Sequence, residues 1–496
     1  MEWVGYSLAL FAPTPLLLML VGTTLGIVVG AIPGLSGTML ISLTLPLTFA
    51  MSPLNAIVLL IAMYVGAISG GLISATLLRM PGTPSSIMTT FDGYPMAQQG
   101  KAARALGLGI VASFVGGLLS WVVLVLLTRP LADLAAGFGP FEKFSLVMMA
   151  LVLIAAVSEG SLLRGLIAGL LGMLVAMPGV DPALGGLRLT FGFNFLDAGL
   201  DLAPVLIGVF AVSQIIRDSS DIEGQPPQIH DIGTRDVLLP WRDWKRHGGN
   251  MLQSSAIGTW IGILPGIGAN IASVVAYTFA RRVSKEPEKF GKGSEEGIIA
   301  SEAANNASVG GALVPLIAMG IPGSVIDAVL LGAFAMHALT PGTLLFQNNP
   351  DLVAAMMGSA LIANFMMFVL MVLTARYIAK LCAVPRAFLL PLIMFFCVVG
   401  TFALRGNMLD VWVMLGFGLV GLALEACRIP LGPFVIGLVL APIAEINLRS
   451  GLMISAGSIE PLFTRPISAV FMFVAIVLLA WQLREELIVS RQTRRV

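Results

Sequence analysis

The stretch Gly30-Ala31-Ile32-Pro33-Gly34-Leu35-Ser36-Gly37-Thr38 decides the fold, because the chain contains a second copy of it. The second copy reads Gly262-Ile263-Leu264-Pro265-Gly266-Ile267-Gly268-Ala269-Asn270, at an offset of 265 − 33 = 232 residues. Each copy places a Pro-Gly break inside an apolar segment, where proline removes a backbone donor and disfavours a continuous helix. Hydrophobic segments interrupted at matching positions are typical of transporters whose binding sites are built from discontinuous helices.

A second pair of breaks follows the first pair in the same order. Met80-Pro81-Gly82-Thr83 corresponds to Ile321-Pro322-Gly323-Ser324, at an offset of 322 − 81 = 241 residues. Two motifs repeated in order and at nearly the same spacing indicate an internal duplication. We therefore predict a first repeat over residues 15–128 and a second repeat over residues 250–375.

The composition indicates a membrane protein. The chain of 496 residues is 57% hydrophobic and only 11% charged, whereas soluble domains carry about 25% charged residues. The mean hydropathy is +0.94, and several apolar runs are long enough to span a bilayer. We predict an all-α polytopic membrane protein with about ten to twelve transmembrane segments. The formal net charge of +1 gives no indication of nucleic-acid binding, and the three cysteines lack metal-site spacing.

Three further regions complete the predicted organisation. Residues 1–14 form a short interfacial N-terminus, and residues 129–249 contain connecting helices followed by a polar surface loop over 217–249. Residues 376–496 contain the C-terminal helices. Four arginines lie between residues 484 and 495, so the positive-inside rule predicts a cytoplasmic C-terminus.

The distribution of basic residues predicts that the two repeats are inverted. Lys101 and Arg104 follow the second break of the first repeat, whereas residues 340–351, at the matching place in the second repeat, contain no Lys or Arg. After the first breaks the bias is reversed, with five basic residues in 281–292 and none in 48–55. The positive-inside rule therefore places matching loops on opposite faces of the membrane.

The first break of the second repeat is predicted to form a re-entrant hairpin. Residues 252–264 and 268–280 are each too short to span a bilayer alone, and basic residues flank both ends. The matching segment of the first repeat, residues 15–50, has no basic flank, which favours a hairpin that enters from the outside.

The breaks provide the groups that a carboxylate site needs. A break exposes backbone N–H and C=O groups, and the N-terminus of a half-helix carries partial positive charge. The predicted substrate-binding residues are Pro33, Gly34, Ser36, Gly37, Thr38, Pro81, Gly82, Thr83, Ser85, Pro265, Gly266, Asn270, Pro322, Gly323 and Ser324. The alternative is close helix packing, which suffices for the flanking glycines taken singly but does not explain the polar residues after each break.

A second set of polar residues is predicted to bind the coupling ion. Glu302, Asn305 and Asn306 are spaced i, i+3 and i+4, so a helix places them on one face. The first repeat has Ile, Tyr and Val at the matching positions within 61–65, so this face belongs to one repeat only. A possible Na⁺ site at Asn305 and Asn306 fits two amide oxygens, whereas Glu302 alone could carry a proton. The alternative is a polar helix entrance near the cytoplasmic surface.

Other charged residues are open to two interpretations. Asp327, directly after the fourth break, either completes the coupling-ion residues or solvates a helix N-terminus. Arg79, beside the second break, either counters a substrate carboxylate or reaches the interface. Glu159 and Arg164 are interpreted as loop charges between two helices, and the three histidines are isolated.

These motifs resemble the TctA family, the large membrane subunit of tripartite tricarboxylate transporters. The most specific stretches are Asp92-Gly93-Tyr94-Pro95 and Glu302-Ala303-Ala304-Asn305-Asn306, and the matching stretches extend over about residues 15–345. The resemblance implies secondary active uptake of a carboxylate by symport across a bacterial inner membrane. It also implies two partners, a periplasmic substrate-binding protein and a small membrane subunit, but it does not identify the carboxylate.

Catalytic motifs are missing from the sequence. There is no phosphate-binding Gly-x-x-x-x-Gly-Lys-Ser/Thr loop, no His-Glu-x-x-His and no Gly-x-Ser-x-Gly. We therefore predict no enzymatic activity and no cofactor apart from a coupling Na⁺ or H⁺. Two alternatives are a stand-alone carboxylate exchanger without a binding protein, and an intramembrane enzyme that uses Glu302, Asp327 and His337.

Overall fold

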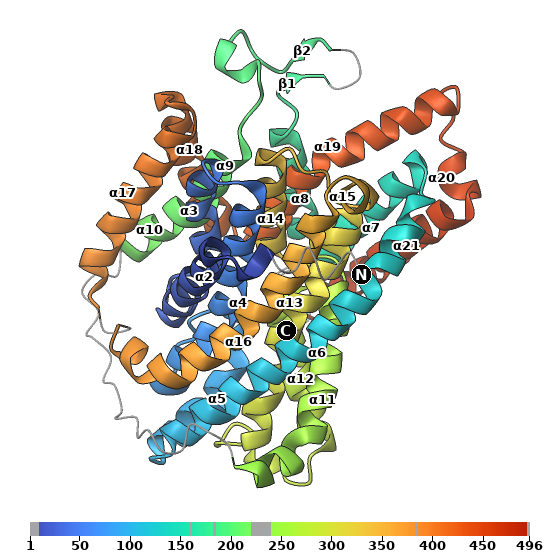
Figure 1. Cartoon of the computed structure of the whole chain (residues 1–496). Helices are drawn as coiled ribbons and strands as arrows, with labels where there is room; N and C mark the ends of the chain where they lie inside the picture. The colour runs from blue at the N-terminus through green and yellow to red at the C-terminus, as the bar shows by residue number, and fades with distance from the viewer. Residues whose placement is uncertain (1–8, 158–160, 182–184, 220–239, 382–383, 494–496) are drawn as a thin grey trace.

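The computed structural model describes residues 9–157, 161–181, 185–219, 240–381 and 384–493, and almost all of its regular structure is helical (Figure 1). Nine helices within these residues are long and apolar enough to cross a membrane. They are α2 (Pro13–Ala31), α4 (Pro53–Leu78), α6 (Ala102–Ala136), α7 (Pro140–Val157), α16 (Pro350–Leu381), α17 (Arg386–Arg405), α18 (Met408–Ala426), α19 (Leu431–Ile454) and α21 (Pro466–Thr493). The all-α polytopic membrane fold expected from the composition is confirmed.

The other α-helices of the described residues are mostly shorter or more polar than these nine. They are α3 (Gly37–Phe49), α5 (Ile87–Gln98), α8 (Leu162–Val175), α9 (Leu202–Ile207), α10 (Ser213–Asp218), α11 (Trp241–Ile263), α12 (Gly268–Val283), α13 (Glu295–Met319), α14 (Val325–Met336), α15 (Thr343–Asn348) and α20 (Pro461–Thr464). A π-helical turn, η4 (Gly208–Val212), joins α9 to α10, and the short helical turns η1, η2, η3 and η6 begin at residues 9, 84, 194 and 287. Three of the shorter helices, α3, α8 and α14, are apolar, so the number of crossings stays a prediction.

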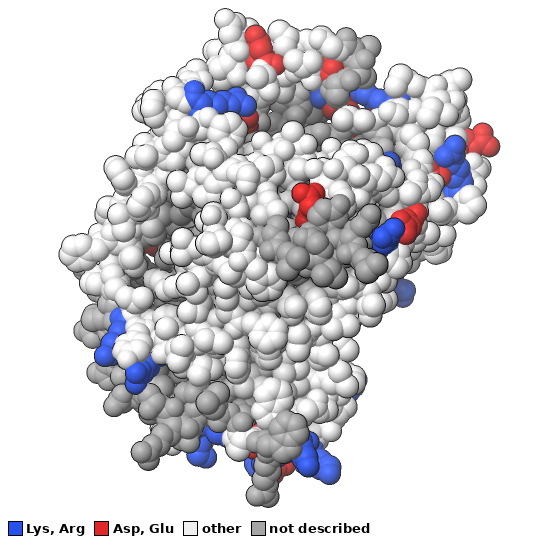
Figure 2. Space-filling model, in the orientation of Figure 1, with Lys and Arg blue, Asp and Glu red and all other residues white. Residues whose placement is uncertain are grey.

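One small extension leaves the helical body. Strands β1 (Gly179–Val180) and β2 (Leu187–Arg188) pair antiparallel and project beyond the helix ends at the top of Figure 1. On the face shown in Figure 2, charged side chains gather toward the two ends of the molecule and leave a broad, mostly uncharged band between them. This distribution fits a body surrounded by lipid, because charged groups are costly in a bilayer.

The Pro-Gly breaks end helices as predicted. The first break separates α2 from α3, and the second separates α4 from η2 and α5; the third lies between α11 and α12, and the fourth between α13 and α14. Gly34 and Gly266 adopt φ angles of +94° and +73°, a conformation that glycine reaches without strain. Ser36 and Ser324 then begin α3 and α14 by accepting hydrogen bonds from the backbone N–H groups of Met39 and Asp327.

The matching breaks of the two predicted repeats pack in a similar way. A Cβ atom on Gly82 would lie 2.0 Å from the carbonyl oxygen of Gly30, and one on Gly323 would lie 2.7 Å from that of Gly262. In both repeats, therefore, the second break packs closely against the end of the helix that precedes the first break, which is α2 in the first repeat and α11 in the second. The opposite orientation of the repeats stays a prediction.

Helices of both repeats cover each repeat's central helix. Helix α6 packs along α13, and α16 packs along α4; likewise α5 contacts α13 and α14 contacts α4. Helix α2 of the same repeat covers most of the remaining surface of α4, and the membrane-length window of α4 is completely buried. The predicted repeat ends at residues 128 and 375 fall inside α6 and α16, which continue to Ala136 and Leu381.

The polar segment over residues 217–249 differs from the predicted loop at both ends. Residues 217 and 218 finish α10, and residues 241–249 form the first turns of α11, because Pro240 lies at the position before the helix, where its missing N–H is not needed. Helix α11 is consequently 23 residues long, and the re-entrant path proposed for it stays a prediction. Residues 220–239, including His230, lie outside the described part of the chain, as do residues 1–8 of the predicted interfacial segment.

Candidate functional site

A cavity of about 800 Å³ lies where the four breaks meet. Residues 36–38 and 83–85 line it from the first repeat, and residues 266–271 and 324–326 line it from the second. Segments that are more than 280 residues apart in the sequence thus line one cavity. Helix α4 contributes Tyr64 and Ile68 to the same wall.

The predicted substrate-binding residues separate into two groups. Those that line the cavity are Ser36, Gly37, Thr38, Thr83, Ser85, Gly266, Asn270 and Ser324. The others shape the breaks behind the cavity wall; they are Pro33, Gly34, Pro81, Gly82, Pro265, Pro322 and Gly323. Binding of a substrate by the first group stays a prediction, but the convergence that it requires is present.

The opposite wall comes from regions outside both predicted repeats. It includes residues 210–217 from η4 and α10, the end of α7, the start of α8, and residues 425–436 around the α18–α19 turn. Arg164 belongs to this wall, so its interpretation as a loop charge was wrong: α8 begins at Leu162 and includes it. Sequence reasoning missed Arg217, Glu425 and Arg428, although ionisable residues beside apolar runs are a known indication of functional sites. Glu159 lies outside the described residues.

Glu302, Asn305 and Asn306 form a completely enclosed polar network behind the cavity. The Oε1 atom of Glu302 accepts a hydrogen bond from Thr89 of α5, and Oε2 accepts one from Ser113 of α6 at 3.2 Å. Asn305 also donates to Oε2 at 3.2 Å. Every oxygen of the Glu302 carboxylate is therefore engaged by a donor, which satisfies a charge that burial would otherwise make costly.

The amide oxygens of this network are engaged as well. The Oδ1 atom of Asn305 accepts a hydrogen bond from Asn306 at 2.6 Å, and the Oδ1 atom of Asn306 accepts one from Ser69 of α4 at 2.6 Å. Each of these amide oxygens accepts one hydrogen bond and has a second lone pair, so its present donor does not by itself exclude a bound cation. Among the described residues no group of three His, Cys, Asp or Glu side chains is arranged to hold a metal ion.

Asp327 belongs to a different network that reaches the cavity. Its Oδ2 atom accepts hydrogen bonds from Ser324 at 2.6 Å and from Tyr64 at 3.5 Å, and the Ser324 and Tyr64 hydroxyls are 3.0 Å apart. Ser324 and Tyr64 line the cavity, whereas Asp327 is fully buried behind them. Its Oδ1 atom has no hydrogen-bond partner among the described residues.

The predicted coupling-ion residues therefore form two networks, which α4 connects. Tyr64 contacts the Asp327 network, and Ser69, one and a half turns later, contacts the Asn306 network. Sequence reasoning had noted Tyr64 only as the apolar counterpart of Asn305, because its hydroxyl partner lies 260 residues away.

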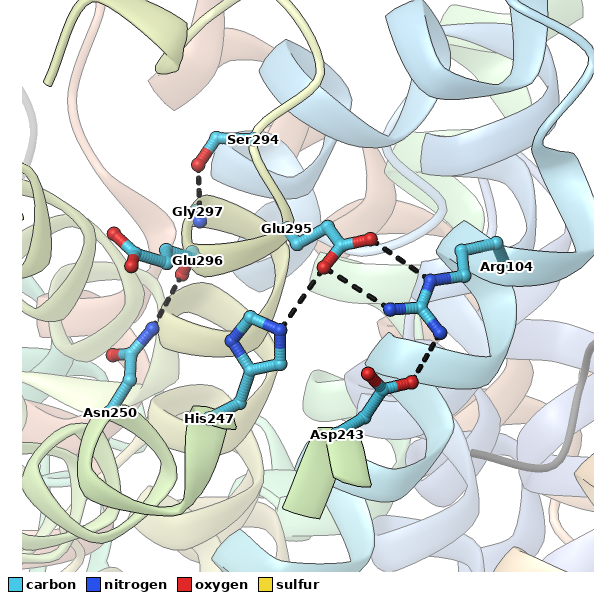
Figure 3. A network of polar contacts seen from close by, with 8 residues as sticks. All are labelled: Arg104, Asp243, His247, Asn250, Ser294, Glu295, Glu296 and Gly297. Carbon is cyan, nitrogen blue, oxygen red and sulfur yellow. Dashed lines mark hydrogen bonds and ion pairs between the residues drawn. The ribbon is translucent and has the colours of Figure 1, made fainter. Parts of the chain in front are cut away.

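A third network lies at the starts of α6, α11 and α13 (Figure 3). Arg104 pairs with Asp243 and with Glu295, whose Oε1 atom is 2.9 Å from Nε, and His247 contacts the Oε2 atom of Glu295 at 3.1 Å. Hydrogen bonds from His247 and then Arg104 lower the pKa of Glu295 to about 2, and the Arg104 hydrogen bond lowers the pKa of Asp243. This network joins the two repeats but does not line the cavity.

Two other candidates from the sequence do not line the cavity. Arg79 is exposed and follows α4 with a φ angle of +56°, and its guanidinium carbon lies 5.9 Å from the centre of the Tyr94 ring. His337 follows α14 and is not among the cavity-lining residues. The intramembrane-enzyme alternative groups His337 with Glu302 and Asp327, but these three side chains do not form a cluster in the described part of the chain.

The breaks, the cavity and the buried polar networks agree with a comparison to known proteins. The sequence profile of the Tripartite tricarboxylate transporter TctA family matches residues 16–436. This chain belongs to the TctA family. The matched region contains all four breaks, so the TctA assignment covers the cavity that they form. TctA proteins are the large subunits of tripartite tricarboxylate transporters.

Two relatives of this TctA chain come from Agrobacterium vitis. One, named "Uncharacterized 52.8 kDa protein in TAR-I ttuC' 3'region", is 33% identical over 469 residues, which are 94% of this chain and 92% of the relative. The other, named "Uncharacterized protein in TAR-II ttuC' 3'region", is 32% identical over 212 residues, which are 43% of this chain and 88% of the relative. No solved structure matches the chain.

Proposed function

We propose that this chain is the substrate-translocating subunit of a binding-protein-dependent, ion-coupled carboxylate transporter of the bacterial inner membrane. The observation that carries the proposal is the convergence of all four Pro-Gly breaks on one cavity. Irregular backbone at membrane depth is tolerated where it is buried in protein or lines a polar space. A cavity bounded on several sides by such backbone is suited to surround a polar substrate.

Carboxylate binding is supported by the helix ends around the cavity. Helices α3, α12 and α14 begin at the cavity wall, at residues 37, 268 and 325, and their N-terminal N–H groups favour negative charge. The hydroxyl groups of Thr38, Thr83 and Ser85 add donors from the first repeat. Several donors from different directions suit a ligand with more than one carboxylate.

Ion coupling is assigned to Asp327 and Glu302. Asp327 is connected to the cavity through Ser324 and Tyr64, so binding of a substrate and of Na⁺ or H⁺ at this place can influence each other. Asn305, Asn306 and Glu302 remain candidates for a second site of this kind. Alternating access would then move one set of helices against the other around the cavity.

The family supports a tripartite assembly with a periplasmic substrate-binding protein and a small membrane subunit. We assign the C-terminus and the basic loop over residues 281–292 to the cytoplasm by the positive-inside rule. Two of the nine membrane-length helices, α19 and α21, lie between the α18–α19 turn and the C-terminus. Two crossings return the chain to the same face, so we assign this turn to the cytoplasmic face as well.

Uptake into vesicles tests this function. The chain and its small subunit are reconstituted, and uptake of radiolabelled citrate and a panel of dicarboxylates is measured with and without the binding protein, under Na⁺ or proton gradients. We expect accumulation only with the binding protein and with one of the two gradients. Full uptake by this chain alone would favour a stand-alone exchanger, and no uptake by correctly inserted protein would contradict carboxylate transport.

A further inference from the structure

The charges of the cavity all come from outside the two repeats. The charged side chains that line it within the described residues are Arg164 on α8, Arg217 on α10, and Glu425 and Arg428 at the end of α18. The break segments contribute only hydroxyl, amide and backbone groups. The repeats thus supply hydrogen-bond donors, whereas the surrounding helices supply the charge.

These charges are not balanced. Arg217 pairs with Glu425, with Nη1 3.0 Å from Oε2, whereas Arg164 and Arg428 form no ion pair with any described residue. Three guanidinium groups and one carboxylate give the wall a formal charge of +2. Arg428 is exposed and Arg164 is partly buried at the cavity wall, so both positive charges are available to an anionic ligand that enters the cavity.

The position of Arg428 is itself unusual. Its φ angle is +56°, and it occupies the turn after α18, where its N–H bonds the carbonyl of Glu425 and the N–H of Ile429 bonds that of Leu424, both at 2.8 Å. Glycine or asparagine is the usual residue in this left-handed position. The turn therefore holds a long cationic side chain where the backbone alone would favour a small residue.

We propose that Arg164 and Arg428 are the charge-selecting residues of this cavity and give it a preference for dianions, such as a small dicarboxylate or a tricarboxylate that carries one proton. The inference rests on the proposed function and narrows its substrate class. Each guanidinium can bind one carboxylate through two parallel hydrogen bonds. A monoanion leaves one arginine uncompensated, and a third carboxylate finds no further unpaired arginine, because Arg217 already pairs with Glu425.

Binding measurements with probes of increasing charge test this assignment. Purified protein is titrated with acetate, succinate and citrate at pH 7.5, and the variants are Arg164→Gln, Arg428→Gln and Glu425→Gln. Each arginine variant is expected to weaken succinate binding roughly tenfold or more, the usual effect of losing a charge-assisted hydrogen bond. Arg164→Lys and Arg428→Lys should retain part of the affinity for succinate, because lysine keeps the positive charge but lacks the planar guanidinium group that binds a carboxylate through two hydrogen bonds. Glu425→Gln is expected to improve citrate binding relative to succinate.

Arg129→Gln is the matched control, because Arg129 is an exposed arginine on α6 that does not line the cavity. Thermal unfolding verifies that the variants are folded, and neither Arg164→Gln nor Arg428→Gln removes an ion pair of the described structure. If wild-type protein binds dicarboxylates and the arginine variants bind them equally well, the charge-selection proposal is wrong while the proposed function stands. If the wild-type protein neither binds nor transports any of the carboxylates, the charge-selection proposal and the proposed function are both wrong.

Discussion

At the scale of single residues, Glu302 and Asp327 are both completely buried, but their oxygen atoms are satisfied differently. Three side chains donate to Glu302, whereas the Oδ1 atom of Asp327 has no partner among the described residues. A buried carboxylate oxygen without a donor is costly, and a proton or a cation at that atom would remove the cost. Asp327 is therefore the stronger candidate for the coupling group.

Replacing Asp327 with Asn should uncouple transport. The amide cannot take up a proton and carries no charge to hold Na⁺, so we expect Asp327→Asn to lose gradient-driven accumulation almost completely while it still binds succinate. Asp351→Asn, at an exposed position at the start of α16, is the control. Vesicle uptake and equilibrium binding are measured in parallel. Normal accumulation by Asp327→Asn under both gradients would exclude the residue from coupling.

Glu295 should contribute stability that depends on pH. Its pKa is lowered from 4.5 to about 2 by His247 and Arg104, so the folded state favours the charged form more than the unfolded state does. The contribution is complete above pH 4.5 and is lost as the pH falls toward 2; a shift of this size corresponds to about 3 kcal/mol. Thermal unfolding of Glu295→Gln should show a deficit at pH 7 that shrinks below pH 4.5.

The adjacent residue provides the control for this measurement. Glu296 lies in the same turn of α13, and it enters the network of Figure 3 through its backbone carbonyl, which accepts a hydrogen bond from Asn250 at 2.9 Å. Glu296→Gln should therefore follow the wild-type pH dependence. An equal deficit for both variants at every pH would argue against the ionic role of Glu295.

At the scale of secondary-structure elements, the breaks differ in how strictly they need glycine. Gly34 and Gly266 both have positive φ angles, but a Cβ atom on Gly266 would also lie 1.7 Å from the Cγ1 atom of Ile154. Backbone strain at a non-glycine residue costs about 1–2 kcal/mol. We expect Gly34→Ala to reduce uptake and Gly266→Ala to reduce it further, with partial recovery in Gly266→Ala combined with Ile154→Ala.

The control for the breaks is Gly416→Ala, in the middle of α18, where an added Cβ atom meets nothing within 4 Å. Uptake is normalised to the amount of inserted protein. If Gly34→Ala and Gly266→Ala both transport like Gly416→Ala, the conformation of the breaks is not required for transport.

The loop between α12 and α13 is held by one carboxylate of the first repeat. Asp92 on α5 accepts hydrogen bonds from the backbone N–H groups of Gly291 and Ser294 at 2.8 Å, from that of Gly293 at 3.0 Å, and from the Tyr277 hydroxyl at 2.8 Å. Each buried donor left without an acceptor costs about 1–3 kcal/mol. Thermal stability should therefore fall in the order wild type, Tyr277→Phe, Asp92→Asn, Asp92→Ala. A wild-type melting temperature for Asp92→Ala would contradict this role.

Elements with local signals could be predicted from the sequence, and contacts between distant segments could not. The Pro-Gly breaks and the long apolar helices depend on neighbouring residues, so their positions were predictable. The partners of Tyr64 and Asp92 lie in segments far away in the sequence, and no periodicity relates them. The sequence did not predict the cavity wall formed by α8, α10 and the α18–α19 turn, because these segments are far apart in the chain and contain no repeated motif.

At the scale of the whole molecule, the central helix of each predicted repeat forms buried hydrogen bonds with the other repeat. Tyr64 of α4 reaches Ser324 and Asp327 beside the fourth break, and Glu302 of α13 reaches Thr89 of α5, just after the second break. Each of these two helices therefore forms a buried hydrogen bond with a residue that lies at or just after a break of the other repeat. Movement at one break would alter a buried hydrogen bond of the other repeat, which offers a physical route for coupling the two sides of the cavity.

The sidedness of the cavity can be tested through Cys427, an exposed residue beside Arg428 in the α18–α19 turn. Cys382 is replaced by Ser, and Cys397 is buried, so a membrane-impermeant maleimide reports on Cys427. The proposed orientation predicts labelling of Cys427 in inside-out vesicles only. Ser458→Cys, in the exposed turn after α19, lies one membrane-length helix away and should be labelled from the opposite side when Cys427 is replaced by Ser.

Substrate should alter this labelling if the cavity is the binding site. Succinate above its dissociation constant is expected to slow the modification of Cys427 several-fold, because a dianion held by Arg428 shields the adjacent thiol, whereas acetate at the same concentration should have little effect. Ser458→Cys provides the distant reference, whose labelling rate should not change with succinate. Labelling of Cys427 and Ser458→Cys from the same side would contradict the path of α19 across the membrane. Equal protection by acetate and succinate would contradict charge selection at Arg428 while leaving that path intact.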